Sequence, residues 1–194
     1  RQTIKPDLKK VAGSQIVYIP FSTEKPVLGG SVYAQVVNQL GATTPQVADA
    51  NYVKNAFALI QDAVENKLAI AGHDIGSGGL ITTLLEMCFP SNGVGLNIDL
   101  SDLTTDSLSH ILFSELPAVV LQTSDANALV TKAKTLGVNI FVIGEYVTNK
   151  QVNIQYKAQK HTFDVKAMRD VWFKTSYLLD VQQSGEVQAT SRKE

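Results

Sequence analysis

Two stretches of the chain repeat apolar residues at the spacing of an amphipathic helix. The first set follows Asp49, a potential N-cap, at intervals of three or four residues: Val53, Phe57, Ile60 and Val64. The second set occupies positions i, i+3, i+4 and i+7 before Pro90, which ends the pattern: Ile81, Leu84, Leu85 and Cys88. Both patterns predict a helix that buries one face.

Short apolar runs elsewhere predict β-strands. The run Gln15–Ile19 is rich in β-branched and aromatic residues and stops at Pro20. Further strands are expected over 68–71, 95–100, 118–122 and 139–143, and residues 152–156 are expected to pair with a neighbouring strand. Additional helices are expected over 31–40, 106–115, 124–136 and 165–179.

The order of these elements predicts the fold class. From residue 68 to 143 strands alternate with helices, which favours an α+β (layered α/β) fold, a mixed sheet with helices packed on it. A length of 194 residues favours one domain. We therefore expect a linker arm over 1–14, one domain over 15–180 and a polar, disordered tail over 181–194.

Composition and charge exclude several classes of protein. The chain is 44% hydrophobic with a formal net charge of −1, and this charge balance gives no electrostatic case for a nucleic-acid partner. No apolar run approaches the roughly 20 residues of a membrane span, and no membrane partner is expected. The single cysteine, Cys88, cannot form an internal disulfide, which favours a reducing, cytoplasmic location. The chain begins Arg1-Gln2-Thr3 without an initiator Met, and we expect it to be a piece of a longer protein.

The segment from His73 to Gly79 is the best candidate for a ligand site. It leaves a predicted strand through His73 and Asp74 and enters a helix through Gly76, Ser77, Gly78 and Gly79. Free backbone N–H groups at a helix start favour phosphate, and a carboxylate such as Asp74 is a ligand that Mg²⁺ prefers. The alternative is a tight strand-to-helix turn in which His73 and Asp74 satisfy backbone groups.

Other chemically capable residues favour structural interpretations. His110 and His161 stand alone, as surface or core histidines usually do. Cys88 lies on the apolar stripe of its helix and is expected to be an inert core thiol. Glu86 lies off that stripe and is expected to face solvent, whereas the helical spacing of Trp172 favours a place in the core.

Four segments together resemble the second C-terminal-type module of the aminoimidazole-ribonucleotide-synthetase superfamily, as carried by the large formylglycinamidine ribonucleotide synthases. The segment from Leu28 to Gln35 resembles that family's LGGSxxAQ motif, and "HDIGSGGLITTLLEMCF", residues 73–89, resembles HDxSDGGLxxTLxEMAF. Residues 112–115, "LFSE", resemble LFxEE, and "RDVWFKTSYLLD", residues 169–180, resembles the W-x-x-T-S helix. The matches keep their order over nearly the whole chain.

The resemblance implies both a fold and a function. The fold is an α+β domain with partial ferredoxin-like topology. The function is part of an ATP-dependent purine-biosynthesis ligase of the glutamine amidotransferase type, which converts formylglycinamide ribonucleotide and glutamine to formylglycinamidine ribonucleotide. The implied cofactors are Mg²⁺ and ATP, with Asp74 as metal ligand and the 76–79 turn contacting nucleotide. The implied partners are nucleotide substrates and the remaining domains of the same polypeptide.

The chain departs from the family pattern at the turn itself. Gly76 stands where the family has the nucleotide-contacting Ser, and Ser77 stands where it has an acidic residue. The Glu-Glu-x-Gly motif reads Glu115-Leu116-Pro117-Ala118 here. These changes leave a non-catalytic alternative open: a pseudo-symmetric structural half, or a ligand-sensing ferredoxin-like module. Another member of the superfamily is a further alternative, against which the LGGS motif and the Trp172 helix argue.

Overall fold

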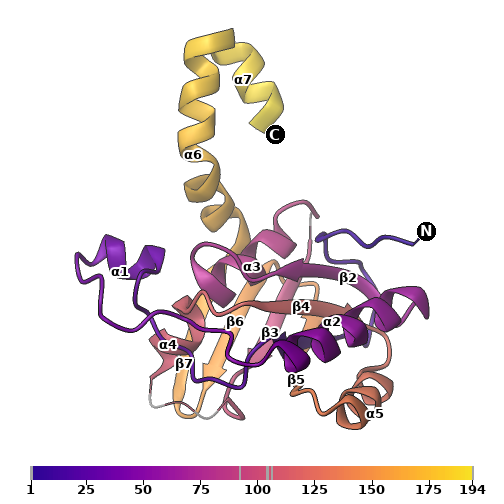
Figure 1. Ribbon diagram of the computed structural model, residues 1–194. Helices are drawn as coiled ribbons and strands as arrows, with labels where there is room; N and C mark the ends of the chain where they lie inside the picture. Colours follow the sequence, from indigo (N-terminus) through magenta and orange to yellow (C-terminus); the bar gives the residue numbers. More distant parts are fainter. Residues whose placement is uncertain (1, 92, 104, 106, 194) are drawn as a thin grey trace.

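The computed structural model describes residues 2–91, 93–103, 105 and 107–193. Within these residues seven strands form one sheet: β1 Gln15–Pro20, β2 Ala69–Asp74, β3 Gly95–Asp99, β4 Ala118–Thr123, β5 Phe141–Val147, β6 Gln151–Tyr156 and β7 Gln159–Asp164. The helices that accompany them are α1 Val32–Val36, α2 Ala50–Glu65, α3 Gly79–Cys88, α4 Leu108–Phe113, α5 Ala126–Leu136, α6 Val165–Ser184 and α7 Glu186–Lys193. Figure 1 shows their arrangement.

The sheet confirms the expected α+β fold and its partial ferredoxin-like topology. Its order is β2-β4-β1-β5-β3-β6-β7, and all neighbouring strands are antiparallel except the parallel pair β3 and β6. Helix α2 joins β1 to β2 with β4 paired between them, and α5 joins β4 to β5 with β1 between them. These interleaved split β-α-β units are the ferredoxin-like part, whereas α3, β3 and α4 are inserted between β2 and β4.

Two apolar clusters cover opposite faces of the sheet, because side chains alternate along each strand. In β1, Val17 and Ile19 pack with α2 and α5, whereas Ile16 packs with α3. Within α2 the predicted apolar stripe is rotated slightly, since Tyr52 and Ala56 are buried and Phe57 is exposed. The sheet is thus the middle layer between α2 and α5 on one side and α3 on the other.

Several elements differ in length from the sequence-based expectations. Helix α1 ends at Val36 instead of reaching residue 40, and β5 continues four residues beyond the expected 139–143 segment. The expected 106–115 helix corresponds to α4, with residue 106 outside the described residues. Strand β7 has no expected counterpart, because its exposed polar residues carry little apolar alternation.

The two ends of the chain are more ordered than composition implied. In the segment expected to be a linker arm, Leu8 is buried and donates its backbone N–H to the Met87 carbonyl at 3.0 Å. In the expected disordered tail, α6 continues to Ser184 and α7 folds back along it, away from the body of the domain (Figure 1). Arg192 pairs with Asp180 at 3.0 Å, and Ala189 is fully buried. Contacts between the two helices stabilise this hairpin, and the composition of the segment does not reveal such contacts.

No helix among the described residues is long and apolar enough to cross a membrane.

Candidate functional site

The predicted turn lies where β2 passes into α3. Asp74 is the last residue of β2, and the next residue, Ile75, is anchored to β4 by an N–H bond to the Ala118 carbonyl at 2.9 Å. Thr83 of α3 donates its hydroxyl to the Asp74 carbonyl at 3.1 Å. These two bonds fix the direction of the chain as it leaves the sheet, so the turn has one defined geometry.

The glycines of the turn have different structural roles. Gly78 and Gly79 have φ values of +88° and +74°, a region that favours glycine. A Cβ on Gly79 would lie 2.6 Å from the Leu112 carbonyl oxygen, so this residue also allows α3 to approach α4. Gly76 has neither constraint, because open space surrounds the position of its Cβ. The family's Ser at this position is therefore compatible with the backbone.

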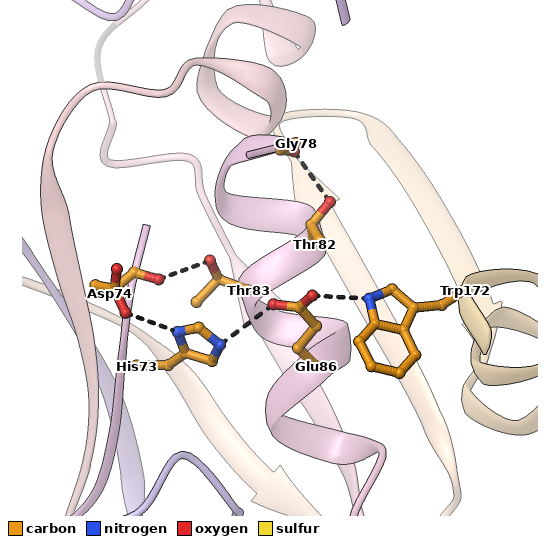
Figure 2. A network of polar contacts seen from close by, with 7 residues as sticks. All are labelled: His73, Asp74, Gly78, Thr82, Thr83, Glu86 and Trp172. Atoms are coloured by element: carbon orange, nitrogen blue, oxygen red, sulfur yellow. Dashed lines mark hydrogen bonds and ion pairs between the residues drawn. The ribbon is translucent and has the colours of Figure 1, made fainter. Parts of the chain in front are cut away.

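A chain of polar contacts connects Asp74 to α6 (Figure 2). His73 lies between two carboxylates, with Nδ1 3.2 Å from Asp74 Oδ1 and Nε2 3.2 Å from Glu86 Oε2. The other oxygen of Glu86 accepts a hydrogen bond from the Trp172 indole N–H at 2.8 Å. The Asp74 side chain is 80% exposed, whereas those of His73 and Glu86 are mostly covered. The network thus holds one oxygen of Asp74 and leaves the carboxylate open to solvent.

The carboxylate of Glu115 already occupies part of the helix start. Its Oε1 accepts the backbone N–H of Gly78 at 2.9 Å and that of Val32 at 2.9 Å. The N–H of Gly79 is also used, by the Gly76 carbonyl at 3.1 Å. The structure therefore brings the 28–35, 73–89 and 112–115 motifs together. The anion bound at the Gly78 N–H, however, is the chain's own Glu115 carboxylate.

Ser77 is the exposed polar group left in this turn. Among the described residues, its backbone N–H and hydroxyl have no hydrogen-bond partner. A phosphate bound here would be contacted by the hydroxyl and N–H of Ser77. Of the N–H groups expected to be free for phosphate at this helix start, those of Gly78 and Gly79 would not contact it, because both are already hydrogen-bonded within the chain.

The described residues supply few ligands for a metal ion. No group of three or more His, Cys, Asp or Glu side chains that could hold a metal lies within the described part of the chain. Asp74 nevertheless fits Mg²⁺, which usually takes one or two carboxylates and fills its remaining positions with phosphate oxygens and water. Its exposed carboxylate could contribute one such ligand to a metal held mainly by a bound nucleotide.

Burial and contacts show the structural setting of the other chemically capable residues. Cys88 is fully buried, and burial raises the pKa of its thiol to about 12, so it is the inert core residue that was expected. His161 is exposed on β7, and the buried Nδ1 of His110 has no hydrogen-bond partner among the described residues. The expectation of a core position for Trp172 is wrong, because the residue is 54% exposed. Glu86, expected to be solvated, instead connects His73 to Trp172.

Sequence reasoning missed the role of Glu86, although a signal was present. Thr82, Thr83 and Glu86 are polar positions within an otherwise apolar helix. Residues three and four apart share a helix face, and Thr83 and Glu86 both contact the end of β2, through the Asp74 carbonyl and His73. The partners themselves, His73 on β2 and Trp172 on α6, are visible only after the elements pack.

Comparisons with known proteins agree with this fold and these motifs. Residues 12–157 match the family described as AIR synthase related protein, C-terminal domain. "Probable phosphoribosylformylglycinamidine synthase, chloroplastic/mitochondrial" of Arabidopsis thaliana is 35% identical over 94% of this chain, and "Phosphoribosylformylglycinamidine synthase" of Homo sapiens is 32% identical over 94%. The chain spans only 13% and 14% of the lengths of these two relatives.

The similarity in three dimensions extends to a more distant protein. The structure "T. maritima PurL complexed with ATP" superimposes on 85% of this chain with a TM-score of 0.66, at 17% identity, and the match covers 27% of that protein. At this identity the likeness concerns the fold. Because the family match covers most of the domain and its motifs meet at one turn, the chain belongs to the family of AIR synthase related proteins, as its C-terminal domain.

Proposed function

We propose that this chain is the part of a phosphoribosylformylglycinamidine synthase that supplies one side of a nucleotide–Mg²⁺ site. Both relatives named above carry that activity in their names, and the T. maritima protein was solved with ATP. The observation that carries the proposal is the exposed Asp74 carboxylate at the end of β2, directly before the Ser77 turn. Asp74 could bind a metal ion, and Ser77, three residues later, could bind a phosphate of the same ligand.

Within such a site the residues of this chain orient ligands. Asp74 contributes a carboxylate oxygen, and His73, held in turn by Glu86, restricts the rotation of that carboxylate. Ser77 offers its hydroxyl and N–H to a phosphate oxygen. When bound, ATP and Mg²⁺ supply the activation of the formylglycinamide amide oxygen, and ammonia from glutamine is the nucleophile.

The chain by itself carries no apparatus for the complete reaction. Its one cysteine is buried with a raised pKa, so it cannot serve as a glutaminase nucleophile. We expect the 194-residue chain to show neither ligase nor glutaminase activity in a coupled phosphate and glutamate assay. A cytoplasmic location remains part of this proposal.

The second candidate is a non-catalytic half of a pseudo-symmetric enzyme. The contact of Glu115 with the Gly78 N–H favours it, because an internal carboxylate stands where a phosphate would otherwise be bound. Under this alternative the turn is structural, and Asp74 has no ligand.

Asp74→Asn separates the two candidates. If Asp74 is a metal ligand, the substitution should abolish the Mg²⁺-dependent part of ADP binding in calorimetry while leaving the melting temperature of the ligand-free chain unchanged. In a full-length synthase that carries this domain, the same substitution should lower kcat. Asp102→Asn, which removes an exposed carboxylate elsewhere, is the matched control. A lower melting temperature with unchanged Mg²⁺–ADP binding and kcat would support the structural alternative and overturn the metal assignment.

A further inference from the structure

Trp172 is exposed and yet held in one orientation. Its indole N–H is bound by Glu86, and its ring contacts Phe89 and Phe173 at centroid distances of 5.5 Å and 6.2 Å (Figure 2 shows the Glu86 bond). A side chain fixed by such contacts has already lost its rotamer freedom, so stacking on it costs little further entropy. The exposed indole is therefore preorganised to bind a flat ring.

The indole lies in a groove between the end of α3 and the α6–α7 hairpin. The groove has a volume of about 900 Å³, within the range of small-molecule sites. Four aromatic residues line it: Phe89, Trp172, Phe173 and Tyr177. It lies at the C-terminal end of α3, whereas the Asp74–Gly79 turn lies before the N-terminal end of that helix. His73 and Glu86 also line the groove, so it adjoins the polar network that reaches Asp74, whereas Asp74 itself and the 76–79 turn are not among its lining residues.

The same groove carries a positive excess in a protein whose net charge is −1. Four cationic side chains line it: Lys150, Lys166, Arg169 and Lys193. Two carboxylates also line the groove, and both already have partners. Glu86 contacts His73 and Trp172, and Asp170 pairs with Lys193 at 3.4 Å.

Two of these cations are available to a ligand. Lys150 and Lys166 are exposed, and within the described part of the chain neither ammonium group has an ion-pair or hydrogen-bond partner. Arg169 donates one N–H to the Lys193 carbonyl at 2.6 Å and retains further donors. Ammonium and guanidinium donors beside a fixed aromatic ring match a ligand that joins a flat base to a phosphate.

We propose that the groove between α3 and the α6–α7 hairpin binds a nucleotide, with its base stacked on Trp172 and its phosphate on Lys150 and Lys166. The ligand would contact neither Asp74 nor Mg²⁺ in this site, which is additional to the proposed site at the turn.

The test uses AMP with the 194-residue chain in a buffer that contains EDTA. Trp172 is the only tryptophan, so its fluorescence reports the groove directly. AMP should quench it saturably, and calorimetry should give the same dissociation constant. Lys150→Ala/Lys166→Ala should weaken binding about tenfold or more, since each lost charged contact affects the phosphate. Lys54→Ala/Lys134→Ala, on α2 and α5, makes the same change in net charge and should bind like the unmodified chain.

Two ligand fragments and one further variant complete the design. Adenosine and ribose 5-phosphate should each bind more weakly than AMP, because each lacks one half of the recognised chemistry. Asp102→Asn, which removes an exposed carboxylate outside the groove, should not weaken AMP binding. The proposal is overturned by an absence of saturable quenching, by equal binding of AMP and either fragment, by equal effects of the two lysine pairs, or by loss of binding in Asp102→Asn. Thermal melting verifies that each variant is folded, and Lys150→Gln and Lys166→Gln singly replace any double variant that is not.

Discussion

Three glycines at the β2–α3 turn have unequal constraints. Gly78 and Gly79 have positive φ, and the missing Cβ of Gly79 lets α3 contact the backbone of α4. Gly76 has open space at the position of a Cβ and no positive φ. The residue that departs from the family motif is thus the one whose backbone does not require glycine.

Gly79→Ala and Gly76→Ser should therefore differ in stability. Gly79→Ala combines positive-φ strain with the 2.6 Å approach to the Leu112 oxygen, and we expect it to cost about 2 kcal/mol or more. Gly76→Ser should change the free energy of unfolding by less than about 0.5 kcal/mol. Urea denaturation of both variants measures the difference. Equal stabilities would show that the turn does not hold Gly79 in this conformation.

The polar side chains near Asp74 are held in place by residues from other helices and strands. His73, Glu86 and Trp172 come from β2, α3 and α6: His73 Nε2 lies 3.2 Å from one oxygen of Glu86, and the Trp172 N–H donates a hydrogen bond to the other. Among the described residues, the Asp74 carboxylate is contacted by His73, the first member of this chain of contacts. The position of Glu86 off the apolar stripe gives by itself no indication of such a role.

Helix α3 is the element that positions the candidate site. One face packs into the core through residues that include Leu84, Met87 and Cys88, and another carries Thr83 and Glu86 toward the end of β2. The turn before it and the groove after it both depend on its placement. Its burial is therefore the main energetic support of both proposed sites.

Leu84→Ala tests that support. Leu84 is fully buried within the α3 cluster, and loss of its side chain should destabilise the domain by about 2–5 kcal/mol. Leu178→Ala is the matched control, because the same truncation on α6 removes a side chain that is 53% exposed and should cost less than about 0.5 kcal/mol. Denaturation midpoints measure both. An unchanged midpoint for Leu84→Ala would contradict the packing of α3.

Over the whole molecule, stability should fall at alkaline pH. Burial raises the pKa of Cys88 from 9.0 to about 12, and burial, then the neighbouring Tyr52, raises that of Tyr18 from 10.0 to about 12. The unfolded chain releases both protons at lower pH than the folded chain, so the contribution is complete below pH 9 and is lost as pH rises toward 12. The slope approaches about 1.4 kcal/mol per pH unit for each group.

Denaturation between neutral and strongly alkaline pH, under reducing conditions, measures this loss. Cys88→Ala and Tyr18→Phe each remove one of the two titrating groups and should flatten the decline. The exposed His161→Gln is a suitable control. A decline of the same slope in both core variants would show that other groups cause it.

The sequence by itself determined most of the elements, the α+β class and the place of the candidate turn. It did so because helical and strand periodicities, glycines and prolines act over a few residues, as in the 81–88 stripe and the Gly78-Gly79 pair. The sequence motifs also identified the family. The sequence did not predict strand β7, the last turn of α6 or helix α7, since these segments are polar and depend on contacts with their neighbours.

Only the tertiary structure decided which side chains meet. It placed Glu115 on the Gly78 N–H, connected His73 to Trp172 through Glu86, and left Trp172 exposed in a cationic groove. These partners lie 13 to 86 residues apart in the sequence. Their proximity follows from how β2, α3 and α6 pack, and no local periodicity encodes that packing.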